Sequence, residues 1–505
     1  MEGTLVNNSL TRRTFLGATL ATATTAALAA CATPSPSRGV TRILATDPMV
    51  GRFEDRRTAS GRITTQQLTA GAFDTTVSGM ALATWGYNNA LNGPVIRART
   101  GDLLDVAVTN NLNEATSIHW HGLALRNNAD GVPGVTQKAI AAGADSSYKF
   151  RLTHPGTYWY HSHVDMQRER ALSGALVIED PNEALSYDQE WVIVLDDWLD
   201  GISGRPEGVL ARLAGGMDMS GMNMSESPML MGSSSAYLGG DAGDVRMPAH
   251  LFNGKTATEP EIFPSKPGNR IRLRIINASG DTAYRVGVPG RKIALTHADG
   301  FPVKHVDVDA VVLGMGERID AILTVTDAFT PLMALPEGKD GSAWGLINAG
   351  GAGAAPQASS LPSSLDGVVT DGGRLKADES VILNAQSPDR IHTMRLTGSM
   401  DNYSWGINGN MFNPDRPFAD AFDIAVNERV QVKIINDTSM WHPMHLHGHS
   451  FQISGNGARK DTVIVRPKET VTFEFDADNP GQWLTHCHNA YHAAKGMMGV
   501  FSYVR

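Results

Sequence analysis

The residues with the clearest chemical meaning lie near the C-terminus, in the sequence His486-Cys487-His488-Asn-Ala-Tyr-His492-Ala-Ala-Lys-Gly-Met497. A cysteine thiolate, a histidine and a weak axial methionine, completed by a second histidine, are the ligand set of copper electron-transfer sites. His486 and His488 flank the cysteine on both sides and are free to bind a different metal. The spacing therefore predicts a redox site whose cysteine is covalently connected to a second metal centre.

Three further groups of histidines can supply the missing ligands. The sequence reads His-Trp-His-Gly over 119–122, His-Ser-His over 161–163 and His-Pro-Met-His-Leu-His-Gly-His over 442–449. Because side chains two residues apart point to the same face of a strand, each His-x-His unit can present both imidazoles to one metal cluster. The other histidines are isolated, and we expect them to be ordinary core or surface residues: His154, His250, His297, His305 and His392.

An internal repeat supports a shared metal cluster. Three segments each place an Asn-Gly turn before an apolar strand that ends on asparagine. The turns are Asn92-Gly93, Asn253-Gly254 and Asn408-Gly409, and the strand ends are Asn110, Asn277 and Asn436. His119 and His445 each follow their asparagine by nine residues, whereas the middle copy has Val286 there. The spacing predicts a cluster between the first and third copies, with the second as a spacer.

Length and composition predict the fold class. A chain of 505 residues suggests about three domains. The 52 glycines and 25 prolines, between runs rich in Val, Ile and Thr, favour all-β sandwiches. We expect domains at 42–183, 184–350 and 373–505, with a linker rich in Gly, Ala, Pro and Ser at 351–372.

Residues 1–30 read as a twin-arginine signal peptide, with Arg12-Arg13 before an alanine-rich apolar stretch. Leu28-Ala-Ala-Cys31 resembles a lipoprotein box, which predicts lipidation of Cys31; the alternative is an ordinary signal peptide in which this cysteine is incidental. We therefore expect an exported protein held at the cell membrane by a lipid anchor. Without a cluster of Lys and Arg, we expect no nucleic-acid partner.

Taken together, these motifs resemble those of the multicopper oxidases, most of all the three-domain bacterial copper-resistance (cuprous) oxidases, including lipoprotein members. The resemblance covers essentially the whole chain after the signal peptide. It implies three consecutive cupredoxin-like Greek-key β-sandwich domains and four copper ions. The implied type 1 copper ligands are His442, Cys487, His492 and axial Met497. The implied type 2 ligands are His119 and His445, and those of the type 3 pair are His121, His161, His163, His447, His486 and His488. His449 has no ligand role in this pattern.

The resemblance also implies a reaction, in which one-electron oxidation of a substrate is coupled to four-electron reduction of O2 to water. Cys487 would carry electrons to the other coppers. Asp130, eleven residues after His119, matches an acidic residue that the family places near the type 2 and type 3 coppers, and we expect it to relay protons. The alternative is a plain turn residue in Asp130-Gly131. A second acid, which some relatives carry directly after the last type 1 histidine, is absent because that position is Ala493.

The expected substrate is Cu(I), because soft thioethers prefer it and a loop at 215–232 is rich in methionine. Its methionines are Met217, Met219, Met222, Met224, Met229 and Met231. The alternative for this loop is an adaptable hydrophobic flap. Asp437 and Met440 are a further candidate docking site. Other functions remain open: a laccase acting on phenols, Mn(II) or Fe(II), or a non-enzymatic copper-binding cupredoxin protein.

Overall fold

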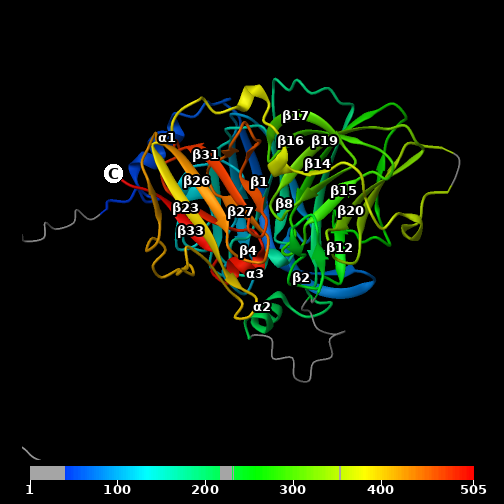
Figure 1. Cartoon of the computed structure of the whole chain (residues 1–505), viewed down its shortest axis with the longest axis horizontal. Helices are drawn as coiled ribbons and strands as arrows, with labels where there is room; N and C mark the ends of the chain where they lie inside the picture. Colours follow the sequence, from blue (N-terminus) through cyan, green and yellow to red (C-terminus); the bar gives the residue numbers. More distant parts are fainter. Residues whose placement is uncertain (1–39, 216–229, 231, 352–353) are drawn as a thin grey trace, which may run out of the picture. The chain divides into compact units, whose positions relative to one another are not determined.

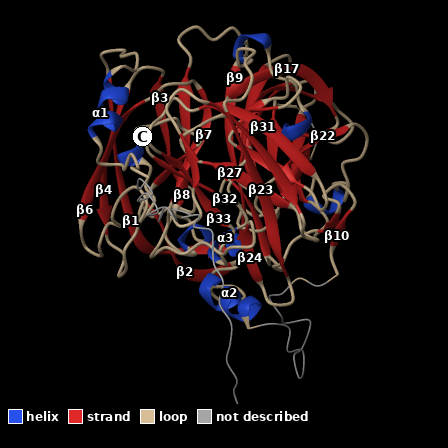
Figure 2. Cartoon of the chain, turned by 60° about the vertical axis from the view of Figure 1, so that its left-hand side comes forward, coloured by secondary structure: helices blue, strands red, loops and turns tan. Residues whose placement is uncertain are grey.

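The computed structural model describes residues 40–215, 230, 232–351 and 354–505. Strands dominate these residues and form three pairs of sheets that follow one another along the sequence (Figures 1 and 2). The predicted all-β fold is confirmed.

The first sandwich pairs a sheet of order β2-β1-β4-β6 with one of order β3-β8-β7-β5. Along β4, Leu104, Val106 and Val108 are buried while their neighbours are less so, the alternation expected of a strand with one face on the core. The strands are β1 (Ile63–Val77), β2 (Met80–Tyr87), β3 (Gly93–Arg99), β4 (Leu103–Asn110), β5 (His119–His121), β6 (Asp145–Arg151), β7 (Gly156–His161) and β8 (Ser173–Glu179).

The second sandwich consists of two six-stranded sheets, β12-β9-β14-β19-β16-β17 and β13-β21-β20-β15-β18-β22. Its strands are β9 (Gln189–Trp198), β12 (Ala249–Phe252), β13 (Glu261–Pro264), β14 (Arg270–Asn277), β15 (Tyr284–Gly287), β16 (Ile293–Ala298), β17 (Phe301–Val308), β18 (Ala310–Leu313), β19 (Arg318–Thr324), β20 (Phe329–Pro336), β21 (Ala343–Asn348) and β22 (Val369–Asp371). A two-stranded ribbon joins β10 (Ser234–Ser235) to β11 (Gly240–Asp241). β22 falls within the predicted linker 351–372 and pairs with β18; the exact domain boundaries stay a prediction.

The third sandwich pairs sheets of order β24-β23-β26-β31-β28-β29 and β25-β33-β32-β27-β30. One continuous apolar core includes residues of the first and third sandwiches, among them Val106 and Val432. The strands are β23 (Arg390–Ser399), β24 (Ser404–Ile407), β25 (Phe422–Ile424), β26 (Arg429–Asn436), β27 (His442–Leu446), β28 (Phe451–Ile453), β29 (Arg459–Lys460), β30 (Thr462–Val465), β31 (Thr470–Asp476), β32 (Gln482–Cys487) and β33 (Met498–Tyr503).

Helices are short. The α-helices are α1 (Pro48–Asp55), α2 (Pro206–Ala214) and α3 (Ala490–Ala494), and the 3-10 turns are η1 (Asn127–Ala129), η2 (Gln167–Glu169), η3 (Ala358–Ser360), η4 (Gly372–Arg374) and η5 (Glu379–Val381). The side chain of Asn489 caps α3 by accepting the N–H groups of Tyr491 and His492, which fixes this histidine just after β32. Among the described residues, no helix has the length and apolar character needed to cross a bilayer.

The three repeat copies have the same local structure at their strand ends. β4, β14 and β26 end on Asn110, Asn277 and Asn436, as predicted, and all three asparagines are fully buried. In each copy the side-chain amide donates to backbone carbonyls of the following loop and of a segment farther along the chain, and its oxygen accepts the N–H two residues ahead. The asparagine thus supplies hydrogen-bond partners to backbone groups that have none where the strand ends.

The predicted turn of the first copy is wrong: its turn asparagine is Asn88 rather than Asn92. Asn88, Asn253 and Asn408 all adopt positive φ, at 55°, 51° and 55°, and each bonds a strand N–H and carbonyl through its side chain. Asn92 instead precedes β3. Asn-Gly is the stronger turn signal in a sequence, but this position needs only a residue that tolerates left-handed backbone.

Candidate metal centre

Strand register brings the histidine motifs together. His119 on β5 pairs with His161 on β7, and His445 on β27 pairs with His486 on β32. His163, His447 and His488 each follow one of these strands closely in sequence, so their rings reach the same region. The cluster is built from the first and third sandwiches, as the repeat predicted, and Val286 of the second lies in that domain's apolar core.

Cys487 lies at the centre of a buried three-residue group that we call the cysteine centre. Its Sγ is 3.6 Å from Nδ1 of His442 and 3.6 Å from Nδ1 of His492, and these two nitrogens are 3.0 Å apart. Met497 is also fully buried, and its carbonyl accepts the N–H of Cys487 at 3.0 Å. A cysteine sulfur and two imidazoles converging in a buried site are a donor set that fits copper.

Eight other histidines form the histidine cluster, in which donor atoms fall into three groups, two of which share His121. The groups are His119, His121 and His445; His121, His161 and His488; and His163, His447 and His486. The two histidines beside Cys487 therefore belong to different groups.

Unpaired ring nitrogens make this cluster suited to bind metal. Five are buried without any hydrogen-bond partner: Nε2 of His119, His161, His163 and His445, and Nδ1 of His121. A buried polar atom without a partner is costly, so a shared ligand explains their convergence. Burial and neighbouring charged groups hold the pKa of His121, His161, His163, His447, His486 and His488 well below the usual value, which keeps these imidazoles neutral and able to bind metal.

Asp130 fixes two rings of the cluster from one side. Its carbonyl accepts Nδ1–H of His119 at 2.9 Å, and its carboxylate lies 3.1 Å from Nδ1 of His447. The side chain is fully buried, and burial raises the pKa of Asp130 above its ordinary value. Hydrogen bonds of this kind set the tautomer and orientation of ligand histidines. The predicted role of Asp130 as a proton relay stays a prediction.

Sequence reasoning missed the groups that hold the cysteine centre from outside. Nε2 of His442 pairs with the hydroxyl of Thr438 at 2.8 Å, and Nε2 of His492 with the carboxylate of Asp244 at 2.9 Å. Although burial opposes protonation, Asp244 raises the pKa of His492 to about 10. Thr438 follows the repeat asparagine and could have been suspected, but Asp244 lies in another domain with no motif around it.

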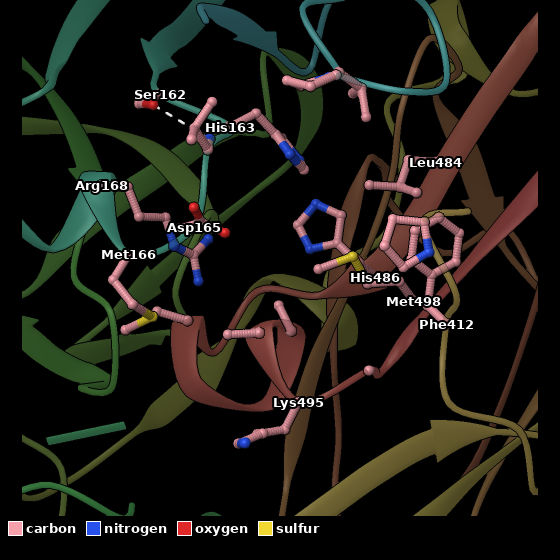
Figure 3. Close-up of a pocket in the computed structure, with 18 of the residues that line it drawn as sticks. Ser162, His163, Asp165, Met166, Arg168, Phe412, Leu484, His486, Lys495 and Met498 are labelled. Carbon is pink, nitrogen blue, oxygen red and sulfur yellow. Dashed lines mark hydrogen bonds between the residues drawn. The ribbon is translucent and has the colours of Figure 1, made fainter. Parts of the chain in front are cut away.

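A pocket of about 510 Å³ opens onto the histidine cluster (Figure 3). His161, His163 and His486 are among its lining residues, and small or apolar side chains line much of the remainder, among them Val132 and Leu484. Arg168 also lines the pocket and donates to Nδ1 of His488 at 3.0 Å and to its carbonyl at 2.7 Å. The arginine was not foreseen, because its partner lies 320 residues away in the sequence.

The predicted substrate residues are only partly described. The six methionines of the 215–232 loop and Cys31 lie outside the described residues. Met440 is buried, with 1% of its surface exposed, whereas Asp437 is exposed and pairs with Arg395 at 2.8 Å. Leu230 donates its N–H to the carbonyl of Asp244 at 2.8 Å. His449, expected to have no ligand role, bonds the hydroxyl of Tyr503 at 2.7 Å.

Comparisons with known proteins agree over nearly the whole chain. Family models described as multicopper oxidase match residues 72–183, 189–332 and 385–504. The multicopper oxidase MmcO of Mycobacterium tuberculosis is 40% identical, over 98% of this chain and 96% of that protein. A copper resistance protein A homolog of Pseudomonas syringae is 28% identical over 85% and 90%.

The solved structures agree with the sequence matches. The laccase from Botrytis aclada superimposes with a TM-score of 0.73 at 25% identity, over 89% of both chains. Three consecutive cupredoxin-like β-sandwich domains are thereby confirmed. The chain belongs to the multicopper oxidases, in the bacterial copper-resistance branch, and is an oxidoreductase.

Proposed function

We propose that this protein is a four-copper enzyme that oxidises Cu(I) to Cu(II) and reduces dioxygen to water. One observation carries the proposal. The cysteine centre is joined through Cys487, by one peptide bond on each side, to His486 and His488, which belong to different groups of the histidine cluster. An isolated electron-transfer or storage site has no need of such a connection.

The residues present fit the proposed coppers. His442, Cys487, His492 and Met497 would hold the type 1 ion; His119 and His445 would hold the type 2 ion. The type 3 pair would take His121, His161, His163, His447, His486 and His488. Copper bound there would supply one-electron transfer and store the four electrons that dioxygen requires.

The protein's own groups would manage protons and access. Asp130 would pass protons between the cluster and its surroundings; its hydrogen bonds to His447 and His119 support this role. The pocket of Figure 3 is suited to a small apolar molecule, because Val132, Leu484 and the alanines of α3 line it together with His161 and His486. We assign it to dioxygen.

Cu(I) is favoured as the substrate by what adjoins the cysteine centre. Asp244 bonds His492 through its carboxylate and Leu230 through its carbonyl. In the sequence Leu230 stands between Met229 and Met231, the last methionines of the Met-rich loop. The proposal that this loop recruits Cu(I) rests on the preference of soft thioethers for that ion.

Steady-state dioxygen consumption with Cu(I), Fe(II), Mn(II) and a phenol, compared side by side, tests the substrate. The highest kcat/KM for Cu(I) supports the proposal. A higher value for the phenol, or for Fe(II) or Mn(II), would replace it with a laccase or another metal oxidase. No oxygen consumption by copper-loaded protein with any reductant would leave only a copper-binding role.

We also propose export by the twin-arginine route and anchoring by a lipid on Cys31, on the strength of Arg12-Arg13 and Leu28-Ala-Ala-Cys31. Cys31→Ala should move the protein from the membrane fraction to the soluble exported fraction while leaving its copper content unchanged. Because a single acyl chain binds membranes only marginally, stable anchoring requires more than one. A wild-type protein that is already soluble, with an unmodified N-terminus, would contradict the anchor.

A further inference from the structure

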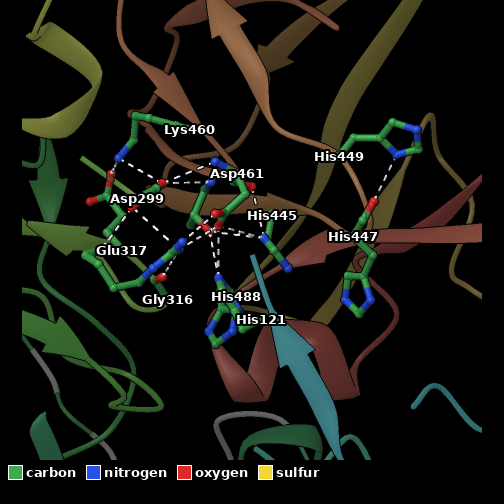
Figure 4. Close-up of polar contacts among 12 residues, drawn as sticks. His121, Asp299, Gly316, Glu317, His445, His447, His449, Lys460, Asp461 and His488 are labelled. Carbon is green, nitrogen blue, oxygen red and sulfur yellow. Dashed lines mark hydrogen bonds and ion pairs between the residues drawn. The ribbon is translucent and has the colours of Figure 1, made fainter. Parts of the chain in front are cut away.

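Five charged side chains are fully buried beside the histidine cluster, where residues of all three sandwiches meet (Figure 4). Asp299, Glu317 and Arg318 come from the second sandwich, and Lys460 and Asp461 from the third. Each has at most 1% of its side chain exposed. Burying so many charges is expensive unless each is paired, so the arrangement needs a reason.

Arg318, the first residue of β19, makes the strongest pair. Its two terminal nitrogens bond both carboxylate oxygens of Asp461, at 2.7 and 2.6 Å. The remaining guanidinium donors reach the carbonyls of Thr157, on β7 of the first sandwich, and of Gly316, both at 3.1 Å. One side chain of the second sandwich therefore bonds groups in both of the others. Only the planar fork of arginine can make all these contacts at once.

Asp461 passes this constraint to two proposed copper ligands. Its carboxylate accepts from Nε2 of His121 at 3.0 Å, and its backbone carbonyl accepts from Nδ1 of His445 at 2.9 Å. His121 belongs to the first sandwich and His445 to the third, so a single aspartate orients rings from both. The opposite nitrogens of these rings, Nδ1 and Nε2, are the ones left unpaired for metal.

The remaining charges hold the backbone of Asp461 in place. The Asp299 carboxylate accepts the N–H groups of Asp461 and Thr462, each at 3.2 Å, and lies 3.0 Å from Nζ of Lys460. Lys460 also pairs with Glu317 at 3.1 Å. The network therefore fixes both the carboxylate and the carbonyl that the histidines use.

Gly316 brings the same loop into direct contact with the cluster. A Cβ at this position would lie 2.9 Å from Cδ2 of His488 and 3.0 Å from Cε1 of His121. The backbone has φ of +88°, a conformation that favours glycine. The loop is thus shaped to let two imidazoles approach it closely.

We propose that the Gly316–Arg318 loop of the second domain is a structural part of the copper cluster, although that domain supplies none of the assigned ligands. Arg318 is a positioning residue: it acts on the copper through Asp461, His121 and His445. The inference rests on the proposed four-copper function. It predicts that the second domain controls copper retention at the type 2 and type 3 sites while leaving the type 1 site alone.

Copper content and electron paramagnetic resonance of purified Arg318→Met test this. We expect the type 2 signal to be reduced or altered, and copper at the cluster to be lost to a chelator at about 10–100-fold lower concentration, as for other residues that support metal ligands. The blue absorption of the cysteine centre should persist, which shows that the variant is folded. Unchanged type 2 signal and chelator sensitivity would overturn the inference. A wild-type protein lacking either signal would instead refute the proposed function.

Arg272→Met is the matched control. Arg272 is also a buried arginine of the second sandwich paired with two carboxylates, Asp320 and Glu183. Within the described residues, neither carboxylate is hydrogen-bonded to an assigned copper ligand. Its loss should lower stability without changing the type 2 signal. If this control alters the signal as much as Arg318→Met does, the effect is general destabilisation and the inference fails.

Two gentler variants cover the case in which Arg318→Met does not fold. Arg318→Lys keeps the charge but cannot form the fork, and should weaken copper retention at the cluster with the blue absorption intact. Gly316→Ala places a methyl group against His121 and His488, whereas Gly290→Ala, with φ of +69° and open space, adds only backbone strain. Cluster copper lost in Gly316→Ala but not in Gly290→Ala supports the inference; equal retention in both would count against it.

Discussion

The carboxylate of Asp244, in the second domain, accepts a hydrogen bond from Nε2 of His492, in the third, at 2.9 Å. Both side chains are fully buried, and the opposite ring nitrogen of the histidine faces the sulfur of Cys487. The acid thus fixes the ring so that one nitrogen is offered to the proposed type 1 copper and the other carries its proton. The backbone carbonyl of the same residue accepts the N–H of Leu230 at 2.8 Å.

Replacing Asp244 should therefore slow electron uptake. In Asp244→Asn the ring loses a charged acceptor, and we expect the rate at which Cu(I) bleaches the blue absorption under anaerobic conditions to fall by about 10–100-fold. Stopped-flow absorption measures this step without involving dioxygen. Asp241→Asn is the control, because Asp241 lies on β11 close by and accepts the N–H of Gly243 instead. Equal bleaching rates in both variants would remove Asp244 from the electron path.

The Met-rich loop should determine which reductant is used. Changing Met217, Met219, Met222, Met224, Met229 and Met231 to serine removes soft ligands but none of the proposed copper-site residues. We expect kcat/KM for Cu(I) to fall about tenfold or more, a loss of about 1.4 kcal/mol in transition-state stabilisation, with phenol oxidation kept or improved. Met80→Ser, an exposed methionine on β2, is the control. Parallel loss of both activities would indicate a structural loop, and unchanged Cu(I) kinetics would favour a laccase.

Glu169 should make stability depend on pH. Burial, helped by the nearby Asp197, raises the pKa of Glu169 from 4.5 to about 8 in the folded protein. A carboxyl with a raised pKa stabilises the fold fully below pH 4.5, and this contribution is lost as the pH rises through 8. In that window the free energy of unfolding of the wild type should fall by up to about 1.4 kcal/mol per pH unit. Glu169→Gln stays neutral and should not show this fall.

Denaturant unfolding of the copper-loaded protein at several pH values from 5 to 9 checks this. The difference in free energy of unfolding between Glu169→Gln and wild type should shift in favour of the variant as the pH rises. Glu207→Gln is the control, because Arg170 bonds the Glu207 carboxylate and the pKa of Glu207 is lowered despite partial burial. A constant difference across the range for Glu169→Gln would mean that its carboxyl is already ionised at pH 5.

The sequence predicted the features that depend on local spacing. Alternating burial along β4, the asparagine that ends each repeat strand, and the pairing of His-x-His units all follow from the period of a strand. The first turn was misplaced because an Asn-Gly pair outweighed Asn88, whose role is visible only through its bonds to the neighbouring strand.

What the sequence could not provide are the partners brought in by tertiary structure. Asp244 meets His492 from 248 residues away, and Arg318 meets Asp461 from 143 residues away. Neither Asp244 nor Arg318 belongs to a sequence motif with regular spacing. A buried ion pair depends on where two domains dock and not on the period of a strand. The second domain was for this reason predicted to be only a spacer, whereas its residues contact both proposed copper centres.

We propose that electrons from Cu(I) pass through Cys487 and reduce dioxygen completely. The most direct test is an oxygen-electrode titration with limiting Cu(I), run with wild type and Cys487→Ser, with hydrogen peroxide assayed at the end. Because water formation requires four electrons, wild type should consume one O2 for every four Cu(I) and form no peroxide, while Cys487→Ser should show no enzymatic consumption. One O2 for every two Cu(I) with peroxide as product, or full activity in Cys487→Ser, would contradict the account.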